Sequence, residues 1–402
     1  MADERVGEML RGAPLPGEEA AEERAWQVVD AAFERRPAAP ARGFFRRRAG
    51  RPALAGAVAL GAVIAAFTPP GEAVGEWISN AVRPARAPSA PALTSLPAEG
   101  RLLVTAADGP WVVQRDGSKR RLGRYEQAGW SPGGLFVVAT RGRQLVALEP
   151  GGAVRWTLTR PQPVSDPAWS PDGYRIAYLS GGSVRVVAGD STADALLAGE
   201  VARVTPAWRP GASHVLAYAD RAGRVVVAQT DTGATLWRAR TAEAPHQLLW
   251  SSDGRRLIAV SRAAVEVFEA QGGRTATLSM PLGARAERVA ADPSGARLAL
   301  VRHQPLRGRS EVVALDLAPR ATQTRVLFAG QGRFSDLAWS PDGAWLLLAW
   351  RDADQWLFIR SDRVGQIRAV SNVGRQFDPG GSGGSGFPGL GGWCCSQPAG
   401  TP

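Results

Sequence analysis

Cysteine is almost absent from this chain of 402 residues: its only two, Cys394 and Cys395, are adjacent and near the end of the sequence. A disulfide framework and a zinc site built from cysteines are therefore excluded. We expect the pair to be a neutral part of a tail, with cross-linking between chains or binding of a soft metal as alternatives. Histidine is nearly as scarce, with three residues, and leaves little material for histidine-dependent catalysis.

Lysine is represented only by Lys119, so arginine supplies nearly all the positive charge behind the net charge of +11. This bias indicates a high-GC bacterial genome more than a DNA-binding surface. Compact nucleic-acid-binding domains cluster Lys and Arg on one element. The clearest cluster here, Arg42 to Arg51, precedes an apolar run and has another explanation, so no nucleic-acid partner is predicted.

Recognisable catalytic motifs are also missing: the chain contains no P-loop, dinucleotide fingerprint or HExxH. Gly380 to Gly384 match G-x-S-x-G, but the hydrolase elbow needs a strand before it and a helix after it, and these residues lie in a Gly-rich stretch. We therefore predict no catalytic residues, no cofactor-binding residues, no metal site and no enzymatic activity.

An amphipathic helix is predicted over Glu18 to Arg36, within a cytoplasmic segment 1–51. Its first turns are acidic and its end is basic, which suits the helix dipole. Trp26, Val29 and Phe33 give it one apolar face, which an isolated helix cannot bury. A protein partner is expected to cover these three residues; a membrane surface or a marginal helix without function are the alternatives.

A transmembrane anchor is predicted over residues 52–68, where 17 residues carry no charge. A buried helix and a signal-peptide core are the alternatives. Arginines precede the run and none follows it closely, so the N-terminus is placed in the cytoplasm and the larger C-terminal part outside. A Pro-rich linker then spans 69–100. The Gly-, Ser- and Pro-rich tail 376–402 is expected not to fold.

Residues 101–375 repeat a short motif. Trp-Ser-Pro-Asp-Gly or a close variant recurs at intervals of 39, 39, 42, 41 and 48 residues, each followed by two strand-length apolar runs. Proline, aspartate and glycine preset a tight turn, and the tryptophan is expected to pack against the next unit. The structural repeat residues are Trp130, Trp169, Asp172, Gly173, Trp208, Trp250, Asp253, Gly254, Trp339, Asp342 and Gly343.

This pattern resembles the WD40-like (PD40) repeat of the TolB-type β-propeller family. The resemblance implies an all-β propeller, and it is nearly silent about function. Residues 102–105 and 111–114 look like strands of one further unit, so seven blades are expected, with six as the alternative. Closing the ring requires a strand from the other end of the chain.

Together these features predict a single-pass, membrane-anchored propeller outside the cytoplasm. It is expected to bind a protein or ligand and to signal to a cytoplasmic partner in the manner of a regulator or anti-sigma factor. The alternative is a TolB-like assembly or scaffold protein of the cell envelope. The sequence does not identify a small-molecule ligand.

Overall fold

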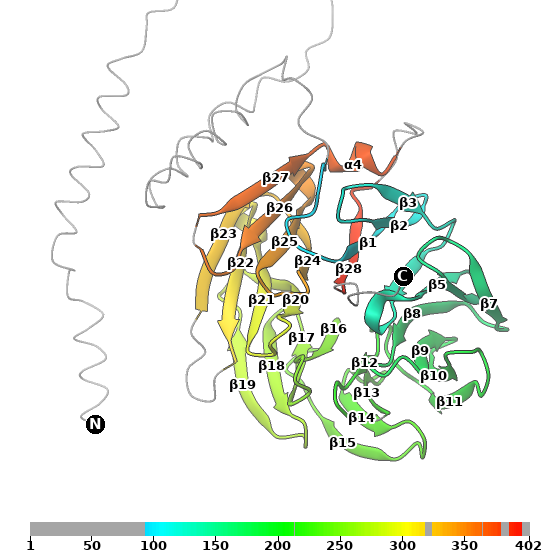
Figure 1. The fold of residues 1–402 in the computed structure, drawn as a ribbon. Coiled ribbons are helices and arrows are strands. Elements are labelled where there is room, and N and C mark those ends of the chain that lie inside the picture. The colour runs from blue at the N-terminus through cyan, green and yellow to red at the C-terminus, as the bar shows by residue number, and fades with distance from the viewer. Residues whose placement is uncertain (1–92, 213, 318–323, 364, 379–385, 396–402) are drawn as a thin grey trace, which may run out of the picture. The chain divides into compact units, whose positions relative to one another are not determined.

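A computed structural model describes residues 93–212, 214–317, 324–363, 365–378 and 386–395. Seven antiparallel four-stranded sheets form a closed ring (Figure 1), so the prediction of seven blades is confirmed and the six-bladed alternative is wrong. Blades are numbered along the chain, and their strands are given from the channel outward. Blade 1 contains β28 (Gly389–Cys394), β1 (Arg101–Ala106), β2 (Gly109–Val113) and β3 (Lys119–Arg121).

The next three blades follow the chain in order. Blade 2 contains β4 (Gln127–Trp130), β5 (Val137–Arg141), β6 (Gln144–Leu148) and β7 (Val154–Thr159). Blade 3 contains β8 (Val164–Trp169), β9 (Arg175–Ser180), β10 (Ser183–Ala188) and β11 (Ala195–Ala198). Blade 4 contains β12 (Ala207–Trp208), β13 (Val215–Ala219), β14 (Val225–Gln229) and β15 (Thr235–Ala239).

Blades 5 to 7 complete the ring. Blade 5 contains β16 (Gln247–Trp250), β17 (Arg256–Val260), β18 (Ala264–Glu269) and β19 (Arg274–Ser279). Blade 6 contains β20 (Arg285–Ala291), β21 (Arg297–Gln304), β22 (Arg309–Asp316) and β23 (Thr324–Gln331). Blade 7 contains β24 (Phe334–Trp339), β25 (Trp345–Trp350), β26 (Gln355–Arg360) and β27 (Ile367–Ser371). Short helical turns are η2 (Pro132–Gly134), η3 (Pro305–Arg307), η4 (Arg351–Ala353) and α4 (Val373–Gln376).

The second and third strands of each blade carry most of the core. Side chains on both faces of these strands are buried against neighbouring blades, as in β9 and β25. Val, Ile, Leu and Ala dominate them because both faces of the sheet are covered. The outer strands β7 and β19 alternate between exposed and half-buried residues instead.

Strand β28 corrects the prediction that residues 376–402 do not fold. It pairs antiparallel with β1 and supplies the innermost strand of blade 1, which joins the two ends of the propeller. Glycine was taken as a sign of disorder, but here it allows close packing: a Cβ on Gly391 would stand 2.9 Å from the Leu103 side chain. Gly392 has φ +122°, where other residues are strained.

Several predictions fall outside the described residues. These are the helix with Trp26, Val29 and Phe33, the anchor over 52–68, and the linker up to residue 92. Within the part that the structure describes, no helix is long and apolar enough to cross a bilayer.

Candidate functional site: the two mouths of the channel

The predicted aspartates and glycines of the repeat build turns. In blade 3, the Ser170 hydroxyl donates to the Asp172 carboxylate, which also accepts from the Tyr174 N–H. Gly173 completes the turn at φ +78°. The same arrangement recurs around Asp253 with Gly254 and around Asp342 with Gly343. These carboxylates hold the backbone of the turn.

Repeat tryptophans lie between blades. The indole N–H groups of Trp208, Trp250 and Trp339 donate to carbonyl oxygens of the preceding inner strand, those of Ala168, Ala207 and Ala290. All three tryptophans are at most 7% exposed. In the described part of the chain, Trp130 and Trp169 lack a partner for this N–H. Trp393 of β28 pairs with Leu102 in β1, as Trp130 of β4 pairs with Val137 in β5. Trp393 is therefore the repeat tryptophan of blade 1.

The inner strands run in the same direction, because equivalent residues near their ends contact one another between neighbouring blades, as Trp208 and Ala168 do. The channel therefore has two different ends. The start mouth is the end at which the inner strands begin, and the turn mouth is the end at which the Ser-Pro-Asp-Gly turns follow them.

Near the start mouth, the residue three positions before the repeat tryptophan is polar in six blades. These belt residues are Gln127, Asp166, Thr205, Gln247, Arg288 and Asp336, where Ala291 stands in for the tryptophan of blade 6. The corresponding residue in blade 1 is Leu390. Each polar belt residue contacts its counterpart or its inner strand in a neighbouring blade. These contacts join blades 2, 3 and 4 and, separately, blades 5, 6, 7 and 1.

The belt contacts between blades 2, 3 and 4 meet at Asp166. Its N–H donates to Gln127 Oε1 at 2.5 Å, and the Thr205 hydroxyl donates to its Oδ1 at 3.0 Å. Asp166 has φ +55°, a left-handed conformation that costs a non-glycine residue free energy. Its Oδ2 is buried and accepts no hydrogen bond from the described residues. The nearest cation is Arg203, whose Nε is 3.9 Å from Oδ2.

The other half of the belt is fully paired. Gln247 exchanges two hydrogen bonds with the backbone of Val289. Arg288 Nε is 3.3 Å from Asp336 Oδ1, and the N–H of Leu390 donates to Asp336 Oδ2 at 3.1 Å. Burial raises the pKa of Asp336, and the Arg288 charge opposes that shift. This carboxylate holds the closing strand β28 against blade 7.

A cavity of about 480 Å³ opens at the start mouth and is lined by Ser165, the chain neighbour of Asp166, and by Gln127. Its wall comes from the beginnings of β4 and β8, the β9–β10 turn and the segment before β12. Polar groups include the side chains of Glu126, Ser165 and Arg203 and the backbone of Gly181 and Gly182. The Arg203 side chain is 80% exposed and so is free to meet a ligand.

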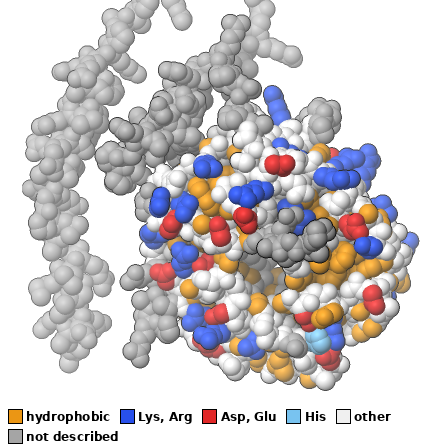
Figure 2. Space-filling model, in the orientation of Figure 1, with side chains coloured by type: hydrophobic (Ala, Val, Ile, Leu, Met, Phe, Trp, Pro, Cys, Tyr) orange, Lys and Arg blue, Asp and Glu red, His pale blue; other side chains and the backbone are white. Residues whose placement is uncertain are grey.

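The turn mouth has a different lining. A hollow of about 550 Å³ is bounded by three repeat tryptophans, three prolines and the two cysteines. Figure 2 shows hydrophobic side chains gathered around the hollowed middle of the ring. The lining side chains are Trp130, Trp169, Trp393, Pro167, Pro293, Pro341, Cys394 and Cys395.

The histidines do not form a common site. His214 lies between Asp231, 2.6 Å from its Nδ1, and Asp172, 3.5 Å from its Nε2. His303 is buried with its Nδ1 2.9 Å from the Ser310 hydroxyl. Among the residues in the described ranges, no group of three or more His, Cys, Asp or Glu side chains could hold a metal ion.

Comparison with known proteins identifies the fold and not a family. No protein-family model matches the sequence, and no curated protein matches it either. Solved structures do match. A protein provisionally named a 6-phosphogluconolactonase from Bacteroides uniformis is 17% identical with a TM-score of 0.53, over 68% of this chain and 97% of its own. The periplasmic gluconolactonase of Pseudomonas aeruginosa is 18% identical with a TM-score of 0.51, over 68% and 96%.

These comparisons correct the prediction that the chain is not an enzyme. That prediction rested on the absence of recognisable catalytic motifs. The same fold occurs in proteins named as lactonases, including a second provisional one from Bacteroides fragilis at 16% identity and a TM-score of 0.51, over 68% of this chain and 94% of its own. At such identities the likeness extends to the fold alone, so binding and catalysis must be separated by experiment.

The belt was missed in the sequence although its signal is present there. Once the tryptophans are aligned, the position three residues before each one is polar in six units, within strands that are otherwise mainly apolar. Asp166 and Asp336 even share the local pattern Ser-Asp-x-Ala-Trp. The repeat motif begins at the tryptophan and continues into the turn, so it predicts the turn mouth and not the start mouth.

Proposed function

We propose that this protein is a membrane-anchored receptor whose extracytoplasmic propeller binds a small hydroxylated molecule at the start mouth. The observation that carries the proposal is Asp166, which combines a left-handed backbone with a buried Oδ2 that accepts no hydrogen bond from the described residues. Its chain neighbour Ser165 and its hydrogen-bond partner Gln127 line the cavity of the start mouth. Among the described residues this oxygen has no donor. A strained backbone costs about 1–3 kcal/mol and is concentrated at functional sites.

The polar groups in the wall of the start-mouth cavity indicate which chemical class of ligand would bind there. A buried carboxylate oxygen without a donor favours a ligand that donates a hydrogen bond, such as a hydroxyl group. Arg203 adds a mobile cation suited to a carboxylate or phosphate, and Glu126 and Ser165 add further polar contacts. A sugar acid provides both kinds of group, and a phosphorylated sugar lactone provides hydroxyl groups and a phosphate. The lactonase names of the fold neighbours make these compounds a reasonable panel to test.

Calorimetric titration of the full-length protein in detergent with a panel of sugar acids and lactones tests this proposal. We expect binding by at least one compound and a loss of roughly 10–100-fold in Asp166→Asn, which corresponds to a hydrogen bond to a charged group. Asp190→Asn is the matched control, because Asp190 is an exposed turn residue in the same blade. Equal binding by both variants, or no binding across the panel, would contradict the proposal.

The same samples decide whether chemistry follows binding. Hydrolysis of the lactones, measured as acid release, would make the start mouth an active site, whereas binding without acid release would make it a receptor site. Either result is compatible with a ligand at Asp166, and only the first gives the protein a catalytic function.

Anchoring and signalling are the parts of the proposal that rest on the sequence. The apolar run over 52–68 would hold the propeller outside the cytoplasm, and Trp26, Val29 and Phe33 would contact a cytoplasmic partner. A reporter fused after residue 402 should be active only outside the cytoplasm. A propeller that instead captures envelope proteins, with no partner for residues 1–51, would favour the TolB-like assembly function.

A further inference from the structure

The two cysteines are joined to each other at the turn mouth. Cys394 is the last residue of β28 and pairs with Arg101, the first residue of β1. The bridge therefore sits where the two ends of the propeller close the ring. Both cysteines are partly exposed and line the hollow of the turn mouth, so a soluble thiol can reach them.

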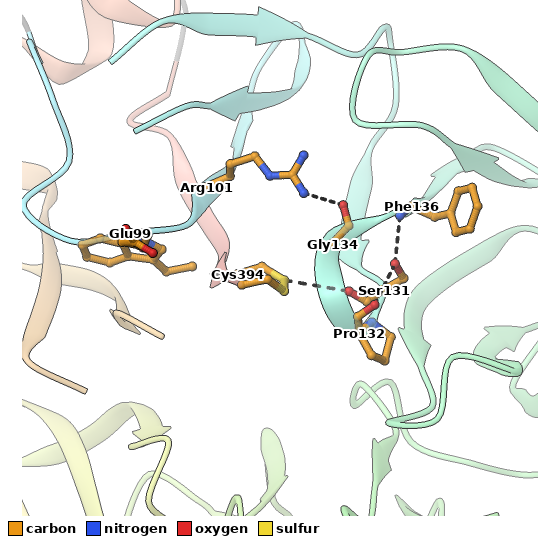
Figure 3. Close-up of a disulfide and its surroundings, with 9 residues drawn as sticks. Glu99, Arg101, Ser131, Pro132, Gly134, Phe136 and Cys394 are labelled. Atoms are coloured by element: carbon orange, nitrogen blue, oxygen red, sulfur yellow. Dashed lines mark hydrogen bonds between the residues drawn. A yellow bond between two sulfur atoms is a disulfide. The ribbon is translucent and has the colours of Figure 1, made fainter. Parts of the chain in front are cut away.

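Gly134 packs on the bridge, and Arg101 bonds to this glycine. A Cβ on Gly134 would stand 3.4 Å from the sulfur of Cys394, 3.5 Å from that of Cys395 and 2.7 Å from Arg101 Nη2. This guanidinium group donates to the Gly134 carbonyl oxygen at 2.6 Å and lies 5.0 Å from the centre of the Trp130 ring. Figure 3 shows Arg101 and Cys394 approaching the same η2 turn from β1 and β28. A positive charge is thus held at the same glycine that packs on both sulfur atoms.

Mechanical stabilisation does not account for this bridge. A disulfide stabilises a fold mainly by restricting the unfolded chain, and the effect grows with the length of the loop that it closes. Cys394 and Cys395 are adjacent, so their bridge closes almost no loop. Exposed sulfurs beside a cation are instead the surroundings of reactive cysteines.

We propose that Cys394 and Cys395 form a redox-active site that exchanges with an external dithiol. A thiolate of that dithiol attacks the Cys395 sulfur, and the bond between the two protein sulfurs breaks. Cys394 leaves as a thiolate beside Arg101. The second thiol of the reductant then attacks the mixed disulfide, which releases Cys395 and the oxidised reductant. Two electrons and two protons pass from the dithiol to the cysteine pair.

Arg101 is the positioning residue in this scheme. Its charge stabilises the departing Cys394 thiolate, and thiols with a lower pKa leave faster. It also bonds to η2, so it keeps the sulfurs against the turn while the bond changes. The proposal does not depend on a ligand at the start mouth, which lies at the other end of the channel.

The experiment treats the folded full-length protein in detergent with dithiothreitol, quenches in acid, alkylates free thiols and counts the added groups by mass. We expect no added groups in the oxidised protein and two after reduction, with the circular dichroism spectrum retained. Oxidised dithiothreitol should restore the bridge. Two free thiols in the air-oxidised protein, or a bridge that opens only in denaturant, would overturn the proposal.

Variants test the part played by the charge. Arg101→Gln should slow reduction by about threefold or more, since the leaving thiolate loses its cation, and Arg101→Lys should restore most of the rate. Arg121→Gln is the control, because Arg121 belongs to the same blade and pairs with Asp108. If Arg101→Gln does not fold, the rate of alkylation of the reduced wild type against pH gives the thiol pKa. A value at or above the ordinary 8.5 would contradict the role of Arg101.

Discussion

The two mouths of the channel are built from the same seven strands but follow different rules. At the turn mouth, a tryptophan recurs in six blades, and a Ser-x-Asp turn follows it in three of them, with the same structural task each time. At the start mouth, the belt position carries glutamine, aspartate, threonine or arginine, with different partners each time. The repeat therefore fixes one end of the ring and leaves the other free to carry a specific site.

The largest effect is expected at the tryptophans. Trp339→Ala removes a buried indole and its hydrogen bond to the Ala290 carbonyl, so it should cost about 3–5 kcal/mol. Trp169→Ala should cost less, because Trp169 is only half-buried, lines the hollow and makes no indole hydrogen bond to the described residues. Urea unfolding measures both. Equal losses of unfolding free energy in the two variants would show that burial and hydrogen bonding of the indole ring do not determine how much each tryptophan stabilises the fold.

Lowering the pH should reduce the stability contributed by Asp253 at the turn mouth and increase the stability contributed by Asp336 at the start mouth. Burial tends to raise the pKa of Asp253 at a turn, but the hydrogen bonds from Ser251 and Arg255 outweigh it, and the net pKa lies below 3.8. Its contribution to stability is therefore present above pH 3.8 and is lost as the pH falls through the folded pKa. Asp336 in the belt has a raised pKa, so its titration favours the folded state at low pH and loses that contribution as the pH rises.

Two variants distinguish these opposite effects of pH on stability. Asp253→Asn should flatten the loss of stability on acidification, whereas Asp336→Asn should steepen it. Thermal unfolding at several pH values between about 3 and 7 measures both. Changes of the same sign in the two variants would contradict the contrast between the mouths.

The smallest effect is expected for a belt residue that only joins blades. Thr205→Val removes the hydroxyl that donates to Asp166 Oδ1 and keeps the shape of the side chain. We expect a loss of about 0.5–1.5 kcal/mol in unfolding free energy. Ligand binding should weaken as well, since Asp166 loses a bond that orients its carboxylate. A loss of stability as large as that for Trp339→Ala would make the belt a main support of the ring.

Much of the fold was predictable because its signal is local. Each Trp-Ser-Pro-Asp-Gly segment specifies a turn through its own side chains, and the spacing of the turns gives the blades. Strand β28 was not predictable in this way, because its glycines are needed only when β1 lies against them. The channel mouths depend on contacts between units about 40 residues apart, and the strained backbone at Asp166 leaves no mark in composition.

Hydrogen exchange with and without a bound ligand tests the central claim most directly, namely that the start mouth carries the specific site. With a sugar acid or lactone that binds in calorimetry, slower exchange is expected in peptides covering 162–166 and 200–205, and unchanged exchange in those covering 131–134 and 340–344. Protection confined to the turn mouth, or none at the start mouth at saturating ligand, would contradict the account.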